Sequence, residues 1–580
     1  MKIKKLTQLK YQLLSAVLLC ITTTVSAFVT VGSTADCDYD NLLDAYNDAD
    51  VFVRITSQQT YSDVFTISKT KWFTGGYDTC AAAETNTLGQ FKTKWTGSNN
   101  GTVVKIDANN PATAIVTLDR FEIFDGLNIF FAGAGGIKVS GNSSLILANS
   151  EVHDNAANEG GGIRVRGANA QVTVTNSSIF NNTSTSAGAG VYCESDAHFT
   201  MIGDSVIRSN IATGNGGGIF GNADCQINVL SGDSLAPLNV QLGIIGNQAA
   251  KGAGVYLKSG ADMTLTGNDE HPASIVGNIS NTDTSPLVVG GGGVYIIDAG
   301  TTFTATNARI DFNIAQNVGA GIGVLDEARF IMGRLDTACW DNDKCSSISD
   351  NIVLKATGDA AAGFIFNQAT ADISGTYIGN NQANETAVFV IEQVAFLRLE
   401  GSLIVDNTSF GQPFASKLFS VKGNNGFAGN LDFFYNTLTS NNANATFFLD
   451  GTSSQQFVRI NNSIIRDQGD IIETTGAINP ALTIACNYVH EIASLTVAQN
   501  PVDNFNFNPE FVDSANGDYH VTSQSLSKDL CNEDSIQSNY NGLNGNVRGF
   551  DDPNVINLRG PFDAGAYEQN NDLIFSSGFD

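Results

Sequence analysis

Residues able to do acid–base chemistry are few in this chain of 580 residues. Its five histidines are His153, His198, His271, His490 and His520. In the pair His153-Asp154, followed by Arg164 and Arg166, the side chains could supply a general base and a substrate clamp. A turn histidine and two outward arginines are more often plain surface residues. The sequence therefore assigns no catalytic residue.

Aromatic residues recur at one strand position in four consecutive segments, and they are Tyr192, Phe220, Tyr256 and Tyr295. Each follows an apolar residue that alternation places inside the fold, so each is expected to point outward. Aromatic faces along a groove suit sugar rings, whose axial C–H bonds pack on them. We therefore predict a solvent-accessible, ligand-binding column, with Asn222 and Lys258 as neighbouring polar groups. The alternative is that loops or the carboxy-terminal part of the chain cover these rings, because exposed apolar patches are rare.

These aromatics lie in a degenerate repeat that spans residues 121–475. Each unit has a glycine-rich triplet, an alternating apolar strand and a hydrophobic-x-x-Asn segment, and the asparagines recur every 26 to 38 residues. One supersecondary unit per repeat, with loops inserted at a corner, is typical of a solenoid. The series consists of Asn155, Asn182, Asn210, Asn247, Asn278, Asn313, Asn351, Asn381, Asn407 and Asn441, closed by Asp467.

Three short strands follow one another within a repeat, at 163–166, 172–175 and 178–180. This pattern predicts an all-β fold, a right-handed parallel β-helix with three strands and three corners per coil. Stacked strands lie about 4.8 Å apart, so the asparagines should form a hydrogen-bonded ladder. The same stacking predicts one buried apolar column made of Ile163, Val191, Ile219, Val255, Val294 and Ile322. An α-solenoid is disfavoured because no 3.6-residue apolar period is sustained.

The amino-terminal segment predicts export. Four lysines precede the apolar run from Leu13 to Val25, and Val25-Ser26-Ala27 fits signal peptidase cleavage. We therefore expect a signal peptide at 1–27 and a secreted or outer-surface protein. No later segment has the roughly 18 unbroken apolar residues of a membrane helix.

The segments on either side of the repeat should close the solenoid. Residues 28–120 are expected to hold an amino-terminal cap and the first coils, 476–568 a carboxy-terminal module, and 569–580 a tail. In the cap, one face of an amphipathic helix should cover the open first coil, because a solenoid must hide its apolar interior. That face consists of Tyr39, Leu42, Leu43 and Tyr46.

Export gives meaning to the cysteines. Removing Cys20 with the signal peptide from the nine cysteines leaves eight, an even number in an oxidising compartment. Nearness in sequence favours four disulfides, although other connectivities remain open, and these are Cys37–Cys80, Cys193–Cys225, Cys339–Cys345 and Cys486–Cys531. No cysteine or histidine spacing typical of a zinc site accompanies them.

The charge of the chain limits its partners. It has 30 Lys and Arg against 58 Asp and Glu, and loss of the signal-peptide lysines takes the net charge from −28 to −32. Nucleic acid is excluded because it needs basic clusters, and anionic polysaccharide is disfavoured by long-range repulsion. No cofactor is predicted. Bound Ca²⁺ would be the exception, but Asp341-Asn342-Asp343 is only a fragment of a calcium loop.

Four segments near the carboxyl end carry a resemblance to a known family. They are Asn508-Pro509-Glu510-Phe511, Gly517-Asp518-Tyr519-His520, Arg548-Gly549 and Asp563-Ala564-Gly565-Ala566-Tyr567-Glu568. Their order resembles the carboxy-terminal region of secreted bacterial β-helix proteins of the choice-of-anchor Q type. The chain departs from that family at 525–529, where a proline-containing turn is usual. The resemblance implies an exported, cell-surface or extracellular protein and implies no reaction.

The final segment, 573–580, resembles the short endings of many exported proteobacterial proteins. Asn281-Thr282-Asp283 is similar to the first motif of polygalacturonases, but the later motifs of that family are missing. We therefore expect a secreted or cell-surface β-helix protein that binds or adheres to glycans or surfaces without catalysis. The alternative is a polysaccharide lyase or glycoside hydrolase of the β-helix type.

Overall fold

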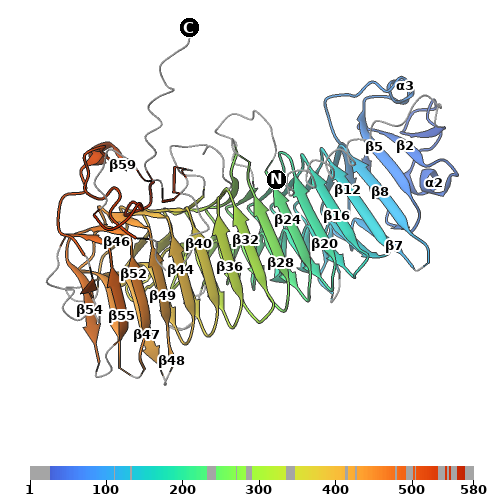
Figure 1. Cartoon of the computed structure of the whole chain (residues 1–580). Helices are drawn as coiled ribbons and strands as arrows, with labels where there is room; N and C mark the ends of the chain where they lie inside the picture. The colour runs from blue at the N-terminus through green and yellow to red at the C-terminus, as the bar shows by residue number, and fades with distance from the viewer. Residues whose placement is uncertain are drawn as a thin grey trace, which may run out of the picture.

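The chain winds into stacked coils that build four long parallel sheets (Figure 1). The coils between β10 (Leu127–Asn128) and β46 (Thr408–Ser409) contribute a strand to each of the four, and the coils at the two ends contribute to three. The computed structural model describes residues 27–568 except 110, 131–132, 232–242, 269–270, 282–289, 335–345, 412–415, 425–426, 453, 477–479, 491–500, 503, 533–541, 545, 547, 550 and 552–557. A typical coil runs through β15 (Ile163–Arg166), β16 (Gln171–Thr175), β17 (Ser178–Phe180) and β18 (Thr183–Ala187), and the next coil begins at β19 (Val191–Glu194). We number the sheets 1 to 4 in this order. Each strand pairs in parallel with its equivalent one coil on, which confirms the predicted parallel β-helix.

The structure has a fourth strand per coil where the sequence predicts three. In several coils the strand in sheet 4 holds only two residues, as in β22 (Ile211–Ala212) and β26 (Gln248–Ala249). Such a segment is too short to show the apolar alternation by which a strand is identified in a sequence. It nevertheless separates the asparagine corner from the glycine corner that leads back to sheet 1.

Apolar side chains fill the interior in columns. Sheet 1 pairs the members of the predicted column coil by coil, and all six are fully buried, which confirms the column. A glycine precedes these strands at the corner from sheet 4, and Gly188 there has a φ of +62°. An L side chain rarely adopts that conformation, so the corner favours glycine.

The predicted asparagine ladder is also confirmed. The backbone N–H and the side-chain Nδ2 of Asn182 both donate to Oδ1 of Asn210, each at 3.0 Å. Nδ2 of Asn182 also donates to the carbonyl oxygen of Val152 in the preceding coil, at 2.9 Å. The ladder ends at Asp467, whose carboxylate accepts from the backbone and side chain of Asn441 at 2.9 and 3.0 Å. Each buried corner therefore has its polar groups satisfied by the next coil.

A second polar ladder, which the sequence reasoning missed, lies at the corner between sheets 2 and 3. There the backbone N–H of Ser150 donates to Oγ of Ser177 at 2.9 Å, and that of Ser463 donates to Oδ1 of Asn487 at 2.9 Å. Serine and asparagine occur at this corner in no regular order. No single residue type therefore recurs once per coil there, and the ladder is not visible in the sequence.

At the amino-terminal end, α2 (Leu42–Asn47) packs on the first coils. Leu42 and Tyr46 are buried as predicted, whereas Leu43 is 40% exposed. Tyr39 lies before the helix, in a bridge with Val31, rather than on its face. The helix is thus shorter than predicted, because Asn41 caps it by accepting from the backbone of Asp44.

Three of the four predicted disulfides are confirmed. Cys37–Cys80, Cys193–Cys225 and Cys486–Cys531 join residues whose Cα atoms lie 5.4, 5.9 and 5.7 Å apart. The pair Cys339–Cys345, the calcium-like fragment 341–343 and the predicted signal peptide and tail lie outside the described residues. Within the described part of the chain, no helix has the length and hydropathy needed to cross a bilayer.

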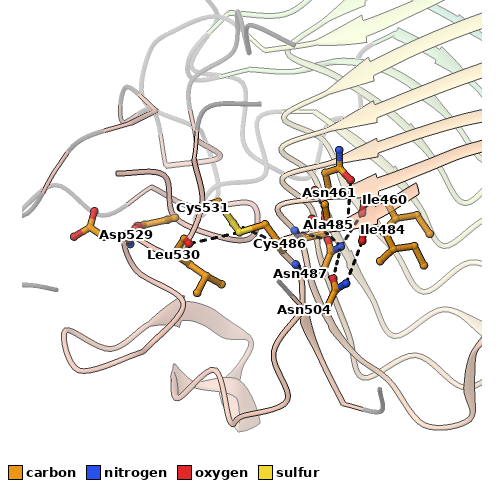
Figure 2. The surroundings of a disulfide bond; sticks show 12 residues. Ile460, Asn461, Ile484, Ala485, Cys486, Asn487, Asn504, Asp529, Leu530 and Cys531 are labelled. Carbon is orange, nitrogen blue, oxygen red and sulfur yellow. Dashed lines mark hydrogen bonds between the residues drawn. A yellow bond between two sulfur atoms is a disulfide. The ribbon is translucent and has the colours of Figure 1, made fainter. Parts of the chain in front are cut away.

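The carboxy-terminal module lies at the last coils (Figure 1). Its apolar residues pack there on the outer face of sheet 3. Coil strands continue to β57 (Pro501–Val502), and module from here on means the segment after that strand. Figure 2 shows the disulfide between Cys486, on the last coils, and Cys531, in the module, beside the hydrogen-bonded amides of Asn487 and Asn504. The module is therefore attached covalently at the corner where the second ladder ends.

Candidate binding site between the β-helix and the carboxy-terminal module

The predicted aromatic column exists as a continuous stack. Tyr192, Phe220, Tyr256 and Tyr295 occupy the same register position of sheet 1, on β19, β23 (Ile219–Asn222), β27 (Val255–Leu257) and β31 (Val294–Ile296). Their ring centroids lie 4.9, 5.3 and 4.9 Å apart, with nearly parallel planes. These distances match the spacing of neighbouring strands, so each ring covers the face of the next.

The expectation that this column is solvent-accessible is wrong. The four residues are only 3–7% exposed, and Ala187 and Leu325 pack against them. Phe220 covers one face of the Tyr192 ring, and the guanidinium of Arg164, 5.0 Å from the ring centroid, covers the other. Burial raises the pKa of Tyr256 to about 12. The role of these rings in ligand binding stays a prediction, but they present no open face on which a sugar could stack.

The residues considered as a base and a clamp are not brought together. His153 lies on sheet 3, where its Nδ1 is 2.7 Å from Asp154 and its Nε2 is 3.1 Å from Glu122. Arg164 lies on sheet 1, buried between Glu159 and Glu194. Arg164 is therefore a buried ion-pair residue, contrary to the expectation of a surface arginine, and Arg166 stands 3.6 Å from Glu194.

The polar neighbours predicted for the column also turn toward it. The side chain of Asn222 hydrogen-bonds with Tyr192, and the ammonium of Lys258 lies 5.9 Å from the ring centroid of Phe220. Both side chains therefore contact rings of the stack.

A different site lies where the module meets sheet 3. We call it the junction hollow, a space of about 520 Å³, which falls within the size range of small-ligand sites. The β-helix contributes Tyr377, Leu403, Val405 and Asp406 to its wall, and the module contributes Asn516, Gly517, Asp518, Tyr519, His520, Leu543 and Tyr567.

The β-helix wall is built from two neighbouring strands of sheet 3. Tyr377 of β41 (Tyr377–Gly379) pairs in register with Leu403 of β45 (Leu403–Val405), so both side chains point to the outer face. Asp406 follows β45 with a φ of +57° and is exposed. This conformation is one that aspartate tolerates better than most residues. The next residue belongs to the asparagine ladder, so the ladder fixes the position of Asp406.

The module wall is a short hairpin of β58 (Phe511–Asp513) and β59 (Asp518–Val521). The ring of Tyr519 packs edge-on against Phe511 at 5.6 Å, and its hydroxyl donates to Ser440 of the β-helix at 3.4 Å. Nδ1 of His520 is 2.7 Å from Asp518. The hairpin therefore presents one ring, one imidazole and one carboxylate to the hollow.

Tyr567 completes the wall, and a buried arginine holds its segment in place. Arg548 donates to the carbonyl oxygens of Gly565 and Ala566 at 2.9 and 3.0 Å, and its ion-pair partner Glu568 is 3.7 Å away. Gly565 sits so close to the β-helix that an added Cβ would lie 2.7 Å from a threonine hydroxyl of β50 (Thr437–Thr439). The segments that carry the family resemblance therefore form the docking surface and half of the hollow.

The chemistry of the hollow combines aromatic surface with hydrogen-bonding groups. Tyr377, Tyr519 and Tyr567 are buried residues that line it, and the rings of Tyr567 and His520 lie 4.1 Å apart. Burial raises the pKa values of Tyr377 and Tyr519, so both phenols stay protonated, and that of Tyr519 donates to Ser440. Two carboxylates, of Asp406 and Asp518, supply acceptors. The three tyrosine rings are only 5–7% exposed, so the hollow offers a ligand mainly hydrogen-bonding groups, and these suit the hydroxyl groups of a neutral polyol.

The sequence did not predict a site here. Gly517, Asp518, Tyr519, His520 and Tyr567 belong to the segments that carry the resemblance, whereas nothing distinguished Tyr377 or Asp406 from other strand and turn residues. Tyr377 and Asp406 are part of the site because the module docks opposite sheet 3, and the sequence does not reveal that docking. Among the described residues, no group of three or more acidic, histidine or cysteine side chains is arranged to hold a metal ion.

No protein-family model matches this chain, and no curated protein matches it either.

Proposed function

We propose that this chain is a secreted or cell-surface β-helix protein that binds a neutral glycan in the junction hollow without cleaving it. The observation that carries the proposal is the wall of the hollow, where three tyrosines stand beside two aspartates and a histidine. Uncharged sugars fit better than acidic ones, because the chain has a net charge of −28 and two of its carboxylates line the hollow.

Two further features support an extracellular location. Three disulfides are typical of an oxidising, extracellular environment. The amino-terminal sequence has the features of an export signal. The resemblance to β-helix proteins of the choice-of-anchor Q type points the same way, and adhesion to a glycan-coated surface is the role we infer.

Binding is tested with the chain from Phe28 onward on a glycan array, followed by calorimetry on the sugars that bind. Asp406→Asn keeps the size and turn preference of the residue but removes its charge, and His520→Gln removes the imidazole. Each should weaken binding roughly tenfold, because each removes one or two hydrogen bonds to the ligand.

The matched control is Asp350→Asn. Asp350 has a φ of +56° and follows β37 (Ser347–Ser349) on the same sheet, outside the hollow. Affinity should stay within a factor of two of the unsubstituted protein. An equal loss in all three variants, or binding that neither hollow variant changes, would place the glycan elsewhere.

Cleavage of a polysaccharide is the second candidate. The specific observation is that the imidazole of His520, oriented by Asp518 at 2.7 Å, and the carboxylate of Asp406 line one hollow, which is the equipment of general acid–base catalysis. The bound glycans should be incubated with the protein and analysed for new reducing ends and for unsaturated products. Neither product is expected if the protein only binds.

A further inference from the structure

We infer a second ligand site, on the outer face of sheet 2 near the carboxy-terminal coils, that takes an extended β-1,4-linked neutral glycan lying along the solenoid axis. This inference shares the ligand class of the proposed function but uses other residues on another sheet. A shallow hollow of about 390 Å³ lies there. Its outward-facing residues include Phe396, Asn430, Asp432, Phe457, Arg459 and Thr483.

Three neighbouring strands fix the geometry of this site. They are β44 (Phe396–Glu400), β49 (Asn430–Phe434) and β52 (Phe457–Asn461), paired in parallel. The register aligns Phe396, Asn430 and Phe457 in one outward column. The two phenylalanines are therefore two coils apart with an asparagine between them.

Exposure separates these rings from ordinary packing residues. Phe457 is 59% exposed and Phe396 is half-buried. Elsewhere the same column of sheet 2 is polar, with Gln171, His198, Gln226, Asp262, Thr302, Arg329 and Thr370 in successive coils. Over the coils from β16 to β55 (Ala481–Ala485), the only aromatic residues in this column are Phe396 and Phe457, and both line the hollow. An exposed ring beside a half-buried one, both in one hollow, marks a binding surface better than scattered apolar residues do.

The spacing of the rings selects the ligand. Two coils correspond to about 10 Å along the axis, twice the distance between neighbouring strands. The two-sugar repeat of an extended β-1,4-linked chain has a closely similar length, and alternate sugars in such a chain turn the same face to one side. A chain along the axis can therefore pack one sugar on Phe457 and the next-but-one on Phe396, while the sugar between them faces Asn430.

The polar groups beside the rings suit an uncharged chain. Nε of Arg459 donates to Asp432 at 2.7 Å, and Nη2 makes a second contact with the same carboxylate. The pair brings little net charge to the surface while holding donors and acceptors in fixed positions at the edge of the hollow. Hydroxyl groups of a neutral sugar can accept from the exposed guanidinium of Arg459, while the carboxylate of Asp432, which is only 6% exposed, balances its charge from beneath.

The test is adsorption of the full mature chain to insoluble chitin and cellulose, with calorimetry on soluble hexasaccharides of each. The double variant Phe396→Ala/Phe457→Ala should lose at least about tenfold in affinity, since two stacking contacts disappear. Phe457→Tyr keeps the ring and should retain binding. Ile146→Ala is the matched control, because Ile146 is a 40% exposed apolar residue on the same face, outside the hollow.

The outcomes are distinct from those of the junction hollow. Unchanged adsorption of the double variant, with an unchanged melting temperature, would overturn this inference and leave the junction site untouched. Failure of the unsubstituted protein to bind any β-1,4-glycan would overturn it as well, whatever the array reveals for the variants of Asp406 and His520. Self-association that the double variant abolishes, without glycan binding, would assign the hollow to a second copy of the chain instead.

Discussion

At the scale of single residues, the end of the asparagine ladder is its weakest point. Ladder asparagines donate Nδ2 to the carbonyl of the coil before, as Asn441 does to Ile404 at 2.9 Å. By the same register, the side chain of Asp467 lies where an asparagine would donate to the carbonyl of Leu438. An ionised carboxylate has no proton to donate there. Burial accordingly raises the pKa of Asp467 to about 7, although its hydrogen bonds with Asn441 act in the opposite direction. A carboxyl that is easier to protonate in the folded state makes folding pH-dependent.

Asp467→Asn should stabilise the protein at neutral and alkaline pH. The pKa is near 4 in the unfolded chain and about 7 in the fold. Stability from the protonated carboxyl is therefore fully present below pH 4 and is lost as the pH rises through 7. The substitution should add up to about 4 kcal/mol at pH 8 and almost nothing at pH 4. Urea unfolding across this pH range measures it.

The converse change gives the control for this prediction. Asn441→Asp puts a second carboxylate one coil earlier, so it should introduce an additional loss of stability with rising pH. If the stability of each variant differed from that of the unsubstituted protein by an amount that did not change with pH, the ladder end would not control the pH dependence of stability.

At the scale of elements, the aromatic stack on sheet 1 acts as a second layer of packing. The core column and the stack alternate along the same strands, so Ile219 points inward and Phe220 outward, yet both are buried. An outward position on this sheet therefore carries packing energy. This differs from the sheet 2 surface around Phe457, where the outward ring is exposed.

Phe220→Ala should lower stability by about 3–5 kcal/mol, comparable with Ile219→Ala at about 2–5 kcal/mol. Removal of the ring leaves a cavity between Tyr192 and Tyr256, which now lie about 10 Å apart with no ring between them. Phe457→Ala should change stability by about 0.5 kcal/mol or less, because its ring is at the surface. Urea unfolding of the three variants makes the comparison, and equal effects for Phe220→Ala and Phe457→Ala would contradict the packing role.

At the scale of the whole molecule, a long solenoid is joined to a small module through apolar packing, one disulfide and a buried arginine. Cys486–Cys531 closes a 45-residue separation, and Arg548 binds the segment that lies against β50. The junction hollow exists only while this joint is intact, since its two walls belong to different parts of the chain.

Cys486→Ser/Cys531→Ser should loosen the module while the coils stay folded. Loss of a disulfide of this loop size costs about 2–4 kcal/mol. Limited proteolysis should release fragments from the region after 508 earlier than in the unsubstituted protein, and glycan affinity at the junction hollow should fall. The control Cys193→Ser/Cys225→Ser removes a bridge between two adjacent coils, so it should leave the module protected. Equal release in both variants would mean that noncovalent contacts alone hold the joint.

The sequence by itself determined the solenoid. Inward positions such as Ile163 and Val191 repeat with the coil, and Asn182 and Asn210 recur at the same corner, because every coil must satisfy the same stacking contacts. Cysteine pairs near in sequence, such as Cys193 and Cys225, lie on adjacent coils for the same reason. These features are local or recur once per coil. Stacking imposes the same requirement on every coil, so the residue types that meet it recur in the sequence at the coil spacing.

Only the tertiary structure decided which outward faces are covered. Alternation shows that Tyr256 points away from the core, but not that neighbouring rings one coil away on either side close both its faces. The sequence likewise holds no sign that Tyr377 faces Tyr567, because these residues are 190 positions apart and meet only through module docking. A surface depends on what packs against it from distant parts of the chain, and such contacts leave no period in the sequence.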